Sequence, residues 1–394
     1  MVIFLFSFTA ILLLVYAALI IFYRQCWGNI KDFAVRKNQE IQSKKASIPV
    51  TIIIPARNEA NNISRCLEAI EKQTYPVNLF EVIVVDDHST DNTAAVVQSF
   101  NKTNIRCIYL KDFISDPINS YKKKAIEIAI AQAGGALIIT TDADCFMGPD
   151  WLETMVAFYE QYEPVFIAAP VLINNTNSFL SIFQALDFMT LQGITGAAVN
   201  SNMHCMCNGA NLAYSKAAFN AVNGFKDIDT IASGDDMLLM HKIFMRYPRR
   251  VLFLKSQKAI VSTKAMDNWK AFFNQRIRWA SKAEQYTDPG ILPVLVLVYF
   301  LNLFLIVLPI AAIFYPRVFF IKALQLTLLD CWLVLLAFKT IIELIFLYPL
   351  AVFFNKTSLL WWFPVAQPFH IIYTVIAGWM GKFGSYQWKD RKVK

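Results

Sequence analysis

The stretch that decides the fold is Ala136-Leu-Ile-Ile-Thr-Thr141, which runs directly into Asp142-Ala143-Asp144. Its apolar and β-branched residues, preceded by Gly134-Gly135, predict a strand that is buried on both faces of a parallel sheet. The two carboxylates then lie at the carboxyl end of that strand, where α/β sheets bind their ligands. Carboxylates are ligands of Mg²⁺ and Mn²⁺, and such an ion suits a diphosphate. Taken alone, the two acids could equally be solvated or could cap the next helix.

Strands and helices alternate through the segment that contains this stretch. Short apolar runs predict strands over residues 50–54, 80–85, 105–110 and 136–141, and helical patterns lie between them over 61–73, with Asn61 as its cap, 89–100 and 122–133. This order is typical of a doubly wound, mostly parallel α/β sheet. No G-x-G-x-x-G follows the first strand, so a dinucleotide-binding site is not predicted.

The two ends of the chain are far more apolar than this middle segment. Apolar residues make up 56% of the whole chain, which is too high for a soluble protein. Residues 1–23 carry no charge and are long enough to cross a bilayer, and basic residues follow them, which predicts an outside N-terminus and a cytoplasmic middle segment. Residues 291–381 are expected to hold three or four further spans. A cytoplasmic basic tail favours four, with a turn near Lys339, and the close alternative is three spans plus a re-entrant piece.

The charged residues and the cysteines indicate which surroundings and which binding partners this chain could have. Asp330, Lys339 and Glu343 would be costly facing lipid, so they are expected to face other helices or the interface. The net charge of +8 is spread over segments that flank the membrane, which favours anionic lipid headgroups over nucleic acid. Seven irregularly spaced cysteines fit a reducing compartment. His204-Cys205-Met-Cys207 has no second Cys or His pair at zinc-finger spacing, so no metal site is predicted there.

Six motifs occur in order along the middle of the chain. They are Ile52-Ile-Ile-Pro55-Ala-Arg57-Asn58-Glu59, Val84-Val-Asp86-Asp87-His-Ser89-Thr90-Asp91, Thr141-Asp142-Ala-Asp144, Asn208-Gly209-Ala-Asn211-Leu-Ala-Tyr214, Gly234-Asp235-Asp236-Met-Leu238 and Gln275-Arg-Ile-Arg278-Trp279. Together they resemble the inverting family 2 glycosyltransferases of the GT-A fold. The last motif resembles the Q-x-x-R-W of membrane-integrated members. The resemblance implies a Rossmann-like α/β GT-A domain in the cytoplasm plus transmembrane α-helices.

The resemblance also assigns roles to residues. It implies that Asp144 directly binds a Mg²⁺ or Mn²⁺ ion on the diphosphate of a UDP- or GDP-sugar, and that Asp142 completes this metal site by contacting the ribose or the water ligands of the ion. Asp236 is the expected base that deprotonates the acceptor, although this chain has Asp235-Asp236 where the family usually has Glu-Asp. A cap for the following helix is the competing interpretation of this pair. The remaining nucleotide-side residues are Pro55, Arg57, Glu59, Asp87 and Lys122, and those that close over acceptor and diphosphate are Asn208, Gly209, Asn211, Gln275, Arg278 and Trp279.

The remaining predictions concern single side chains and two further helices. Asp86 is expected to cap a turn, and Glu59 could simply pair with Arg57. Lys122 and Lys123 either lie near the phosphates or are solvated. Residues 178–199 are expected to form a surface helix near the acceptor, and residues 269–286 an amphipathic helix in the headgroup layer.

The expected organisation follows from these patterns. An N-terminal transmembrane helix spans 1–23, a linker 24–47, the GT-A domain 48–264, and the interfacial helix with Q-x-x-R-W 265–290. Transmembrane helices fill 291–381 and a basic tail fills 382–394.

The predicted function is transfer of a sugar to a lipid-linked or saccharide acceptor at the cytoplasmic face of a bacterial inner membrane. A processive polysaccharide synthase coupled to export is one alternative, but it needs more spans for a pore. A membrane-anchored nucleotidyltransferase is another, but the loop after the first strand lacks the glycines that it should carry. A transporter is the third, yet the chemistry-bearing residues cluster outside the spans.

Overall fold

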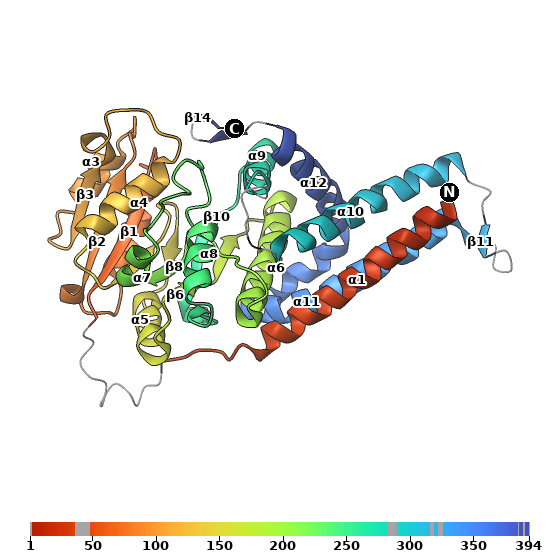
Figure 1. The fold of residues 1–394 in the computed structure, drawn as a ribbon, viewed down its shortest axis with the longest axis horizontal. Coiled ribbons are helices and arrows are strands. Elements are labelled where there is room, and N and C mark those ends of the chain that lie inside the picture. The colour runs from red at the N-terminus through yellow and green to blue at the C-terminus, as the bar shows by residue number, and fades with distance from the viewer. Residues whose placement is uncertain are drawn as a thin grey trace.

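The computed structural model describes residues 2–35, 48–282, 288, 290–315, 319–321, 326–384, 386–388 and 391–393. Within them an α/β domain adjoins a bundle of long apolar helices (Figure 1). The second half of the linker 24–47, the end of the helix expected over 269–286, and the tail residues 385, 389, 390 and 394 lie outside the described residues.

A sheet of seven strands forms the core of the α/β domain, in the order β3-β2-β1-β4-β8-β6-β9. Its parallel half joins β1 (Val50–Ala56), β2 (Phe80–Asp86), β3 (Ile105–Tyr109) and β4 (Leu137–Thr140) through α2 (Ile63–Glu71), α3 (Thr93–Ser99) and α4 (Tyr121–Gln132). All four strands were predicted from their short apolar runs. The structure confirms that β1, β2 and β4 are almost entirely buried, as strands of a covered parallel sheet should be. The cap expected at Asn61 is wrong by one position, since Asn62 precedes α2.

The other half of the sheet makes it mixed. Here β8 (Leu212–Ser215) runs antiparallel to both β4 and β6 (Phe166–Ala168), while β9 (Val251–Phe253) runs parallel to β6. A small second sheet of β5 (Phe146–Met147), β10 (Val261–Lys264) and β7 (Val171–Asn174) begins just after Asp144. Helices α5 (Trp151–Tyr162), α7 (Lys216–Ala221), α8 (Met237–Arg246) and α9 (Trp269–Ala280) complete the domain, with short 3₁₀ turns at Val77–Leu79, Leu110–Asp112 and Gln257–Ala259.

Helix α6 (Phe179–Ser201) lies between the α/β domain and the apolar bundle (Figure 1). The expectation of a surface helix is wrong, because most of α6 is buried. A Cβ at Gly193 would lie 2.3 Å from the Leu350 side chain, and one at Gly196 would lie 2.8 Å from Trp27. These small residues let the neighbouring helices approach closely.

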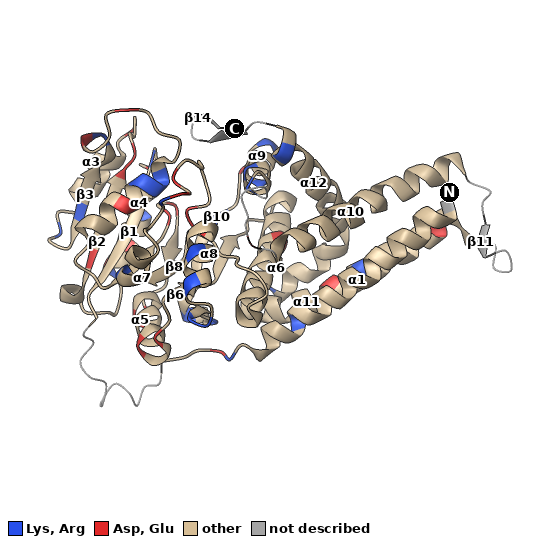
Figure 2. Ribbon diagram, in the orientation of Figure 1, with Lys and Arg blue, Asp and Glu red and all other residues tan. Residues whose placement is uncertain are grey.

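Four helices are long and apolar enough to cross a membrane: α1 (Val2–Asn29), α10 (Ile291–Phe314), α11 (Leu328–Phe353) and α12 (Phe363–Phe383), the last preceded by a 3₁₀ turn at Thr357–Trp362. Figure 2 shows how few charges their ribbons carry compared with the α/β domain. The expected turn near Lys339 is wrong, since α11 runs through it without a break. Lys339 Nζ lies 2.6 Å from Glu343 Oε1 one turn later, so the two charges neutralise each other inside the bundle.

Helix α12 differs from the other three in direction. In Figure 1, α1, α10 and α11 run together along the length of the bundle, whereas α12 crosses them at the end near the α/β domain. Close contacts fix this position: a Cβ at Gly381 would lie 2.7 Å from Ala280 Cβ in α9, and one at Gly378 would lie 2.8 Å from Tyr299 in α10. Two small hairpins, β11 (Phe319–Ile321) with β12 (Leu326–Thr327) and β13 (Tyr386–Trp388) with β14 (Arg391–Val393), complete the described elements.

Candidate active site

The loops that follow β1 and β2 are tied to each other. Arg57 Nη1 donates hydrogen bonds to the backbone carbonyls of Asp87 (2.9 Å) and His88 (3.2 Å). Asp86 accepts a bond from the Ser89 amide and caps the turn, as predicted. The expected nucleotide-side residues Pro55, Arg57, Glu59 and Asp87 therefore lie in or beside one pair of connected loops, because the carboxyl ends of parallel strands share one edge of the sheet.

The acid pair after β4 lies next to these loops. Asp142, Asp144 and Cys145 each offer a ligand atom, all within 4.8 Å of one another. Burial, and then the charges of Asp142 and Glu59, raise the pKa of Asp144. The Thr263 hydroxyl, from β10, donates to Asp144 Oδ2 at 3.1 Å and orients it. A divalent cation would relieve the repulsion between these carboxylates, so the residues fit the ion that the sequence predicted.

Lys122 connects the acids that follow β4 to the second acid pair, Asp235 and Asp236. Its Nζ lies 2.8 Å from Asp142 Oδ1 and 3.2 Å from Asp235 Oδ2. Although burial opposes its charge, the carboxylates of Asp142 and Asp235 raise the pKa of Lys122 far above its usual range. Lys122 is therefore neither solvated nor isolated in this state. Its ammonium lies between two groups of acids and pairs with both.

Asp236 lies at the start of α8 with both carboxylate oxygens engaged. Oδ1 accepts a hydrogen bond from the Met237 amide at 2.8 Å, and Oδ2 accepts one from the Gly209 amide at 3.1 Å. Burial opposes ionisation, but Lys282, whose Nζ is 3.8 Å away, and Lys122 together lower the pKa of Asp236. Asp236 does cap α8, as the competing interpretation predicted. This cap leaves an ionised carboxylate in place, which is the state that a base needs.

Lys123 has a different role from its neighbour. Its Nζ donates to the carbonyls of Ile228 (2.6 Å), Ile231 (2.6 Å) and Ser233 (3.0 Å). Burial lowers its pKa to about 8. The expectation that Lys123 adds charge near phosphates is therefore wrong, because its ammonium is used to fix the loop that leads to Gly234-Asp235-Asp236. The sequence shows that Lys122 and Lys123 are adjacent, but it does not show that their side chains bind different groups.

The segment Asn208-Gly209-Ala-Asn211 approaches these acids at one residue. A Cβ at Gly209 would lie 3.2 Å from Lys122 Nζ and 3.4 Å from Asp235 Oδ2, so this position has little room for a side chain. Asn211 instead faces the interior. Its Oδ1 accepts a hydrogen bond from the Trp151 indole, and its Nδ2 donates to the carbonyls of Pro170 and Ala259. Its hydrogen bonds hold the two sheets together, which does not match the predicted contact with acceptor.

A cavity of about 720 Å³ opens from Asp236 toward the long helices. Asn208, Asp236 and Trp279 line it on the side of the α/β domain. The rest of its wall is mostly apolar and comes from α1, α6, α10 and α12, with side chains such as Leu19, Leu186, Val298, Phe363 and Ala377. Its size suits one ligand molecule. The long apolar helices themselves therefore form a large part of the wall in front of Asp236.

The Gln275-Arg-Ile-Arg278-Trp279 segment of α9 contributes unevenly to this cavity. Trp279 lines it, and the Arg276 guanidinium lies 4.2 Å from the centre of the Trp279 ring. Arg276 is buried and also lines the cavity. Gln275 and Arg278 are not among the described residues that line it. One face of α9 packs against the protein, because Phe272, Arg276 and Ile277 are buried and Trp269 stacks on Phe369 of α12.

Two buried ion pairs are built into the cavity wall. Arg276 Nη2 lies 2.7 Å from Asp187 Oδ2, and the Tyr373 hydroxyl donates to the same carboxylate. Lys339 pairs with Glu343, which also accepts hydrogen bonds from Tyr16 and Gln367. Glu343 and Lys339 face other helices, as their sequence context predicted, and Asp330 caps α11 through Thr327. Asp187 and Tyr373 were missed, since their partners are distant in sequence.

Comparisons with known proteins identify the family of this chain. The family model "Glycosyl transferase family 2" matches residues 51–221, and "Glycosyl transferase family group 2" matches residues 137–379, more than half of the chain. "Glycosyltransferase AglE" of Haloferax volcanii is 37% identical over 110 residues, 27% of this chain and 34% of that protein. "Probable glycosyltransferase YdaM" of Bacillus subtilis is 26% identical over 247 residues, 60% of this chain and 55% of that protein. The chain thus spans about a third to a half of the length of these curated relatives.

A solved structure supports the fold over nearly the whole chain. Mannosyltransferase PcManGT from Pyrobaculum calidifontis, in complex with GDP-Man and Mn²⁺, covers 94% of this chain and 97% of its own, with a TM-score of 0.55 at 19% identity. The predicted α/β fold with added membrane-type helices is confirmed. The chain belongs to the family 2 group of glycosyltransferases and has the GT-A fold.

Proposed function

We propose that this chain transfers a sugar, with inversion at the anomeric carbon, from a nucleotide-diphosphate sugar to a hydroxyl group of a lipid-linked acceptor. The position of Asp236 carries this proposal. Its neighbour Asp235 pairs with Lys122, which also pairs with Asp142 after β4, and Asp236 itself lines the cavity between the long helices. A base at this junction has the donor on one side and a largely apolar chamber on the other.

The donor side is proposed to hold a UDP- or GDP-sugar with Mg²⁺ or Mn²⁺. Asp144 and Asp142 would hold the ion, which when bound neutralises charge on the departing diphosphate. Pro55, Arg57, Glu59 and Asp87 would surround the base and ribose. The fit of the acids around Asp144 supports the ion, and PcManGT was solved with GDP-Man and Mn²⁺.

On the acceptor side, Asp236 would take the hydroxyl proton as the acceptor oxygen attacks the anomeric carbon. The bond from that carbon to the diphosphate breaks on the opposite face, so no covalent enzyme intermediate is needed. Trp279 is proposed to pack against the acceptor or the sugar in the cavity. The apolar walls favour an acceptor with a hydrocarbon chain, since burial of apolar surface contributes about 25 cal/mol per Å².

The membrane arrangement is proposed to have three crossings. With α1, α10 and α11 across the bilayer and α12 lying at its cytoplasmic face, the N-terminus is outside and the α/β domain and Lys394 are inside, in accord with the basic residues after α1. This differs from both expected arrangements, the four C-terminal spans and the three spans plus a re-entrant piece, because only two full crossings follow the domain. A cysteine introduced beside Lys394 should resist a membrane-impermeant reagent in intact cells, and labelling there would place α12 across the membrane.

The function is tested with membranes that contain the full chain. Labelled UDP- and GDP-sugars are supplied in turn, and label is counted in lipid, polymer and water-soluble fractions, with Asp236→Asn membranes as the matched control. We expect label from one donor in the lipid fraction, absent from the control. Label in long polymer would favour a processive synthase. No transfer to any fraction from any donor would contradict the proposal.

A further inference from the structure

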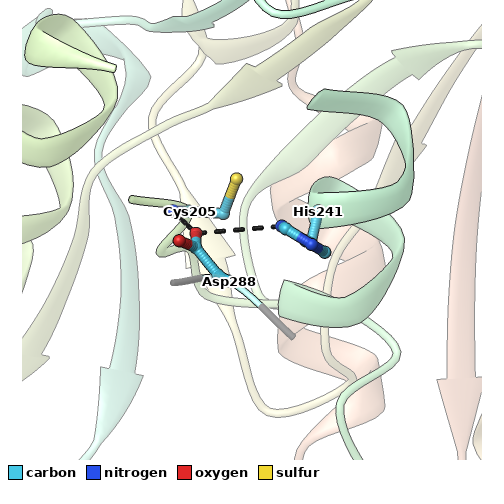
Figure 3. A group of neighbouring side chains, drawn as sticks. All are labelled: Cys205, His241 and Asp288. Atoms are coloured by element: carbon cyan, nitrogen blue, oxygen red, sulfur yellow. Dashed lines mark hydrogen bonds and ion pairs between the residues drawn. The ribbon is translucent and has the colours of Figure 1, made fainter. Parts of the chain in front are cut away.

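Three side chains from distant parts of the chain meet beside α8 (Figure 3). Cys205 follows α6, His241 belongs to α8, and Asp288 precedes α10. A sulfur, a ring nitrogen and a carboxylate oxygen lie within 4.8 Å of one another. We propose that Cys205, His241 and Asp288 bind a zinc ion, separate from the ion expected at Asp144. Cysteine, histidine and aspartate are all established zinc ligands, and three protein ligands leave one position for water.

One candidate ligand atom in this group, His241 Nδ1, lacks a hydrogen-bond partner among the described residues. This nitrogen is buried. The nearest carboxylate oxygen, Asp288 Oδ2, is 3.7 Å away, too far for a hydrogen bond. Buried polar atoms are normally satisfied, so the position of this nitrogen calls for a further group. A cation between His241, Asp288 and the Cys205 sulfur would supply it.

The carboxylate is already oriented by the backbone. Asp288 Oδ2 accepts a hydrogen bond from the Cys205 amide at 2.7 Å, and Oδ1 accepts one from the Gly290 amide at 2.9 Å. Hydrogen bonds of this kind fix the direction of a metal ligand and contribute strongly to affinity. The side chains of His241 and Asp288 are 14% and 10% exposed. An ion could therefore reach the group from solvent and yet be largely shielded once bound.

The chemistry of the group favours zinc over the ions proposed at Asp144. Mg²⁺ and Mn²⁺ prefer oxygen ligands, whereas a thiolate with an imidazole suits Zn²⁺. The cysteine and histidine spacing in the sequence predicted no metal site, because His241 and Asp288 are far from Cys205 along the chain. Chain folding brings them together.

The proposed ion would join three segments that position Asp236. The loop with Cys205 leads to Gly209, whose amide binds Asp236. His241 lies on α8, which Asp236 caps, and Asp288 follows the segment that carries Lys282. The ion would therefore have a positioning role and would add to stability, since metal binding free energy contributes to folding.

The test uses the purified full chain, first treated with a chelator and then titrated with Zn²⁺ alone, with zinc counted by mass spectrometry. We expect about one tightly held zinc per chain. Cys205→Ser, His241→Gln and Asp288→Asn should each lower zinc affinity by at least about 10-fold. Cys207→Ser, which alters a nearby buried thiol outside the group, and Asp144→Asn should both retain zinc.

A second measurement does not depend on the variants folding. Co²⁺ added to the chelator-treated wild-type chain should give a thiolate-to-cobalt charge-transfer band, and Zn²⁺ should abolish it. Failure of the wild type to retain zinc and to give this band would overturn the proposal. So would a zinc content unchanged in all three ligand variants, or lost equally in Asp144→Asn.

Discussion

Lys122 and Arg276 are both enclosed cations that pair with aspartates near the same cavity, yet their surroundings differ. The Lys122 side chain is 23% exposed, and its partner Asp142 is 37% exposed. Arg276 and Asp187 are each only 3% exposed. Lys122 also has a second partner, Asp235, on the opposite side of the site. Arg276 is held by stacking against Phe272 and Trp279 as well as by its ion pair.

This difference separates charges that can change partners from charges that cannot. A partly exposed pair contributes little and is easily replaced by a ligand that offers a stronger charge. Arg276–Asp187 and Lys339–Glu343 are sealed pairs, in which both side chains are almost fully buried. Breaking a sealed pair leaves a buried charge without compensation, which costs about 3–5 kcal/mol. We therefore infer that the Lys122 group rearranges when the donor binds, whereas Arg276–Asp187 and Lys339–Glu343 fix the helices around the cavity.

The largest effect is expected at the proposed base. Asp236→Asn keeps the shape of the side chain but cannot take a proton, so transfer should fall by about 10²–10⁴-fold. Donor binding should change little, since Asp142 and Asp144 remain. The matched variant Asp235→Asn should be milder. The inverse result, with Asp235→Asn inactive and Asp236→Asn active, would move the base to Asp235, and two active variants would leave Asp236 as only a helix cap.

The sealed pairs should matter for stability more than for chemistry. Lys339→Met leaves Glu343 buried without its cation and should lower the free energy of unfolding by about 3–5 kcal/mol. The double variant Lys339→Met with Glu343→Leu should recover most of this loss, because both charges are gone. Thermal unfolding in detergent measures the two variants against wild type. Equal stability of wild type and the single variant would show that the pair is not sealed.

Removal of a metal-side acid should have the next largest effect. Asp144→Asn loses one anionic ligand, and activity should fall by at least about 10²-fold, since groups that merely orient a ligand already contribute 10–100-fold. Treatment with EDTA should have a comparable effect on wild type that Mn²⁺ or Mg²⁺ reverses. Full transfer activity in EDTA would exclude the ion from the account.

The exchangeable cation should affect donor binding by a smaller factor. Lys122→Gln removes the charge that faces Asp142 and Asp235, and one charge-assisted hydrogen bond contributes about 1.5–3 kcal/mol. The KM for the donor should therefore rise by about 10-fold or somewhat more, while thermal stability changes little. A large loss of stability with an unchanged KM would place Lys122 among the sealed groups.

The parallel half of the sheet and its acids could be predicted because their signals are local. The apolar runs of β1, β2 and β4 end in Pro55, Asp86 and Asp142, and strand order then brings these ends together. The acid pair at Asp235-Asp236 and its helix were predicted for the same reason. A short motif beside a regular element is enough for such a prediction.

The errors lie where burial and partner choice depend on distant segments. Nothing local showed that Lys123 would bind three carbonyls of a loop about a hundred residues later, or that Asn211 would join two sheets. The turn expected at Lys339 followed from the even number of crossings that a cytoplasmic basic tail requires. In the folded bundle Lys339 instead pairs with Glu343, which Tyr16 and Gln367 also bind, so α11 carries this charge without a break. Helix α6 was misplaced because an apolar sequence does not reveal which helices cover it.

The most direct measurement is a cryo-electron microscopy structure of the full chain with Mn²⁺ and a bound nucleotide sugar. The Asp236→Asn variant would keep the donor intact. We predict that Lys122 Nζ leaves Asp142, moving beyond the roughly 4 Å of an ion pair, and contacts a phosphate while Asp142 and Asp144 face the ion. Arg276–Asp187 and Lys339–Glu343 should remain as they are. A structure in which Lys122 still pairs with Asp142, with the diphosphate bound elsewhere, would contradict the account.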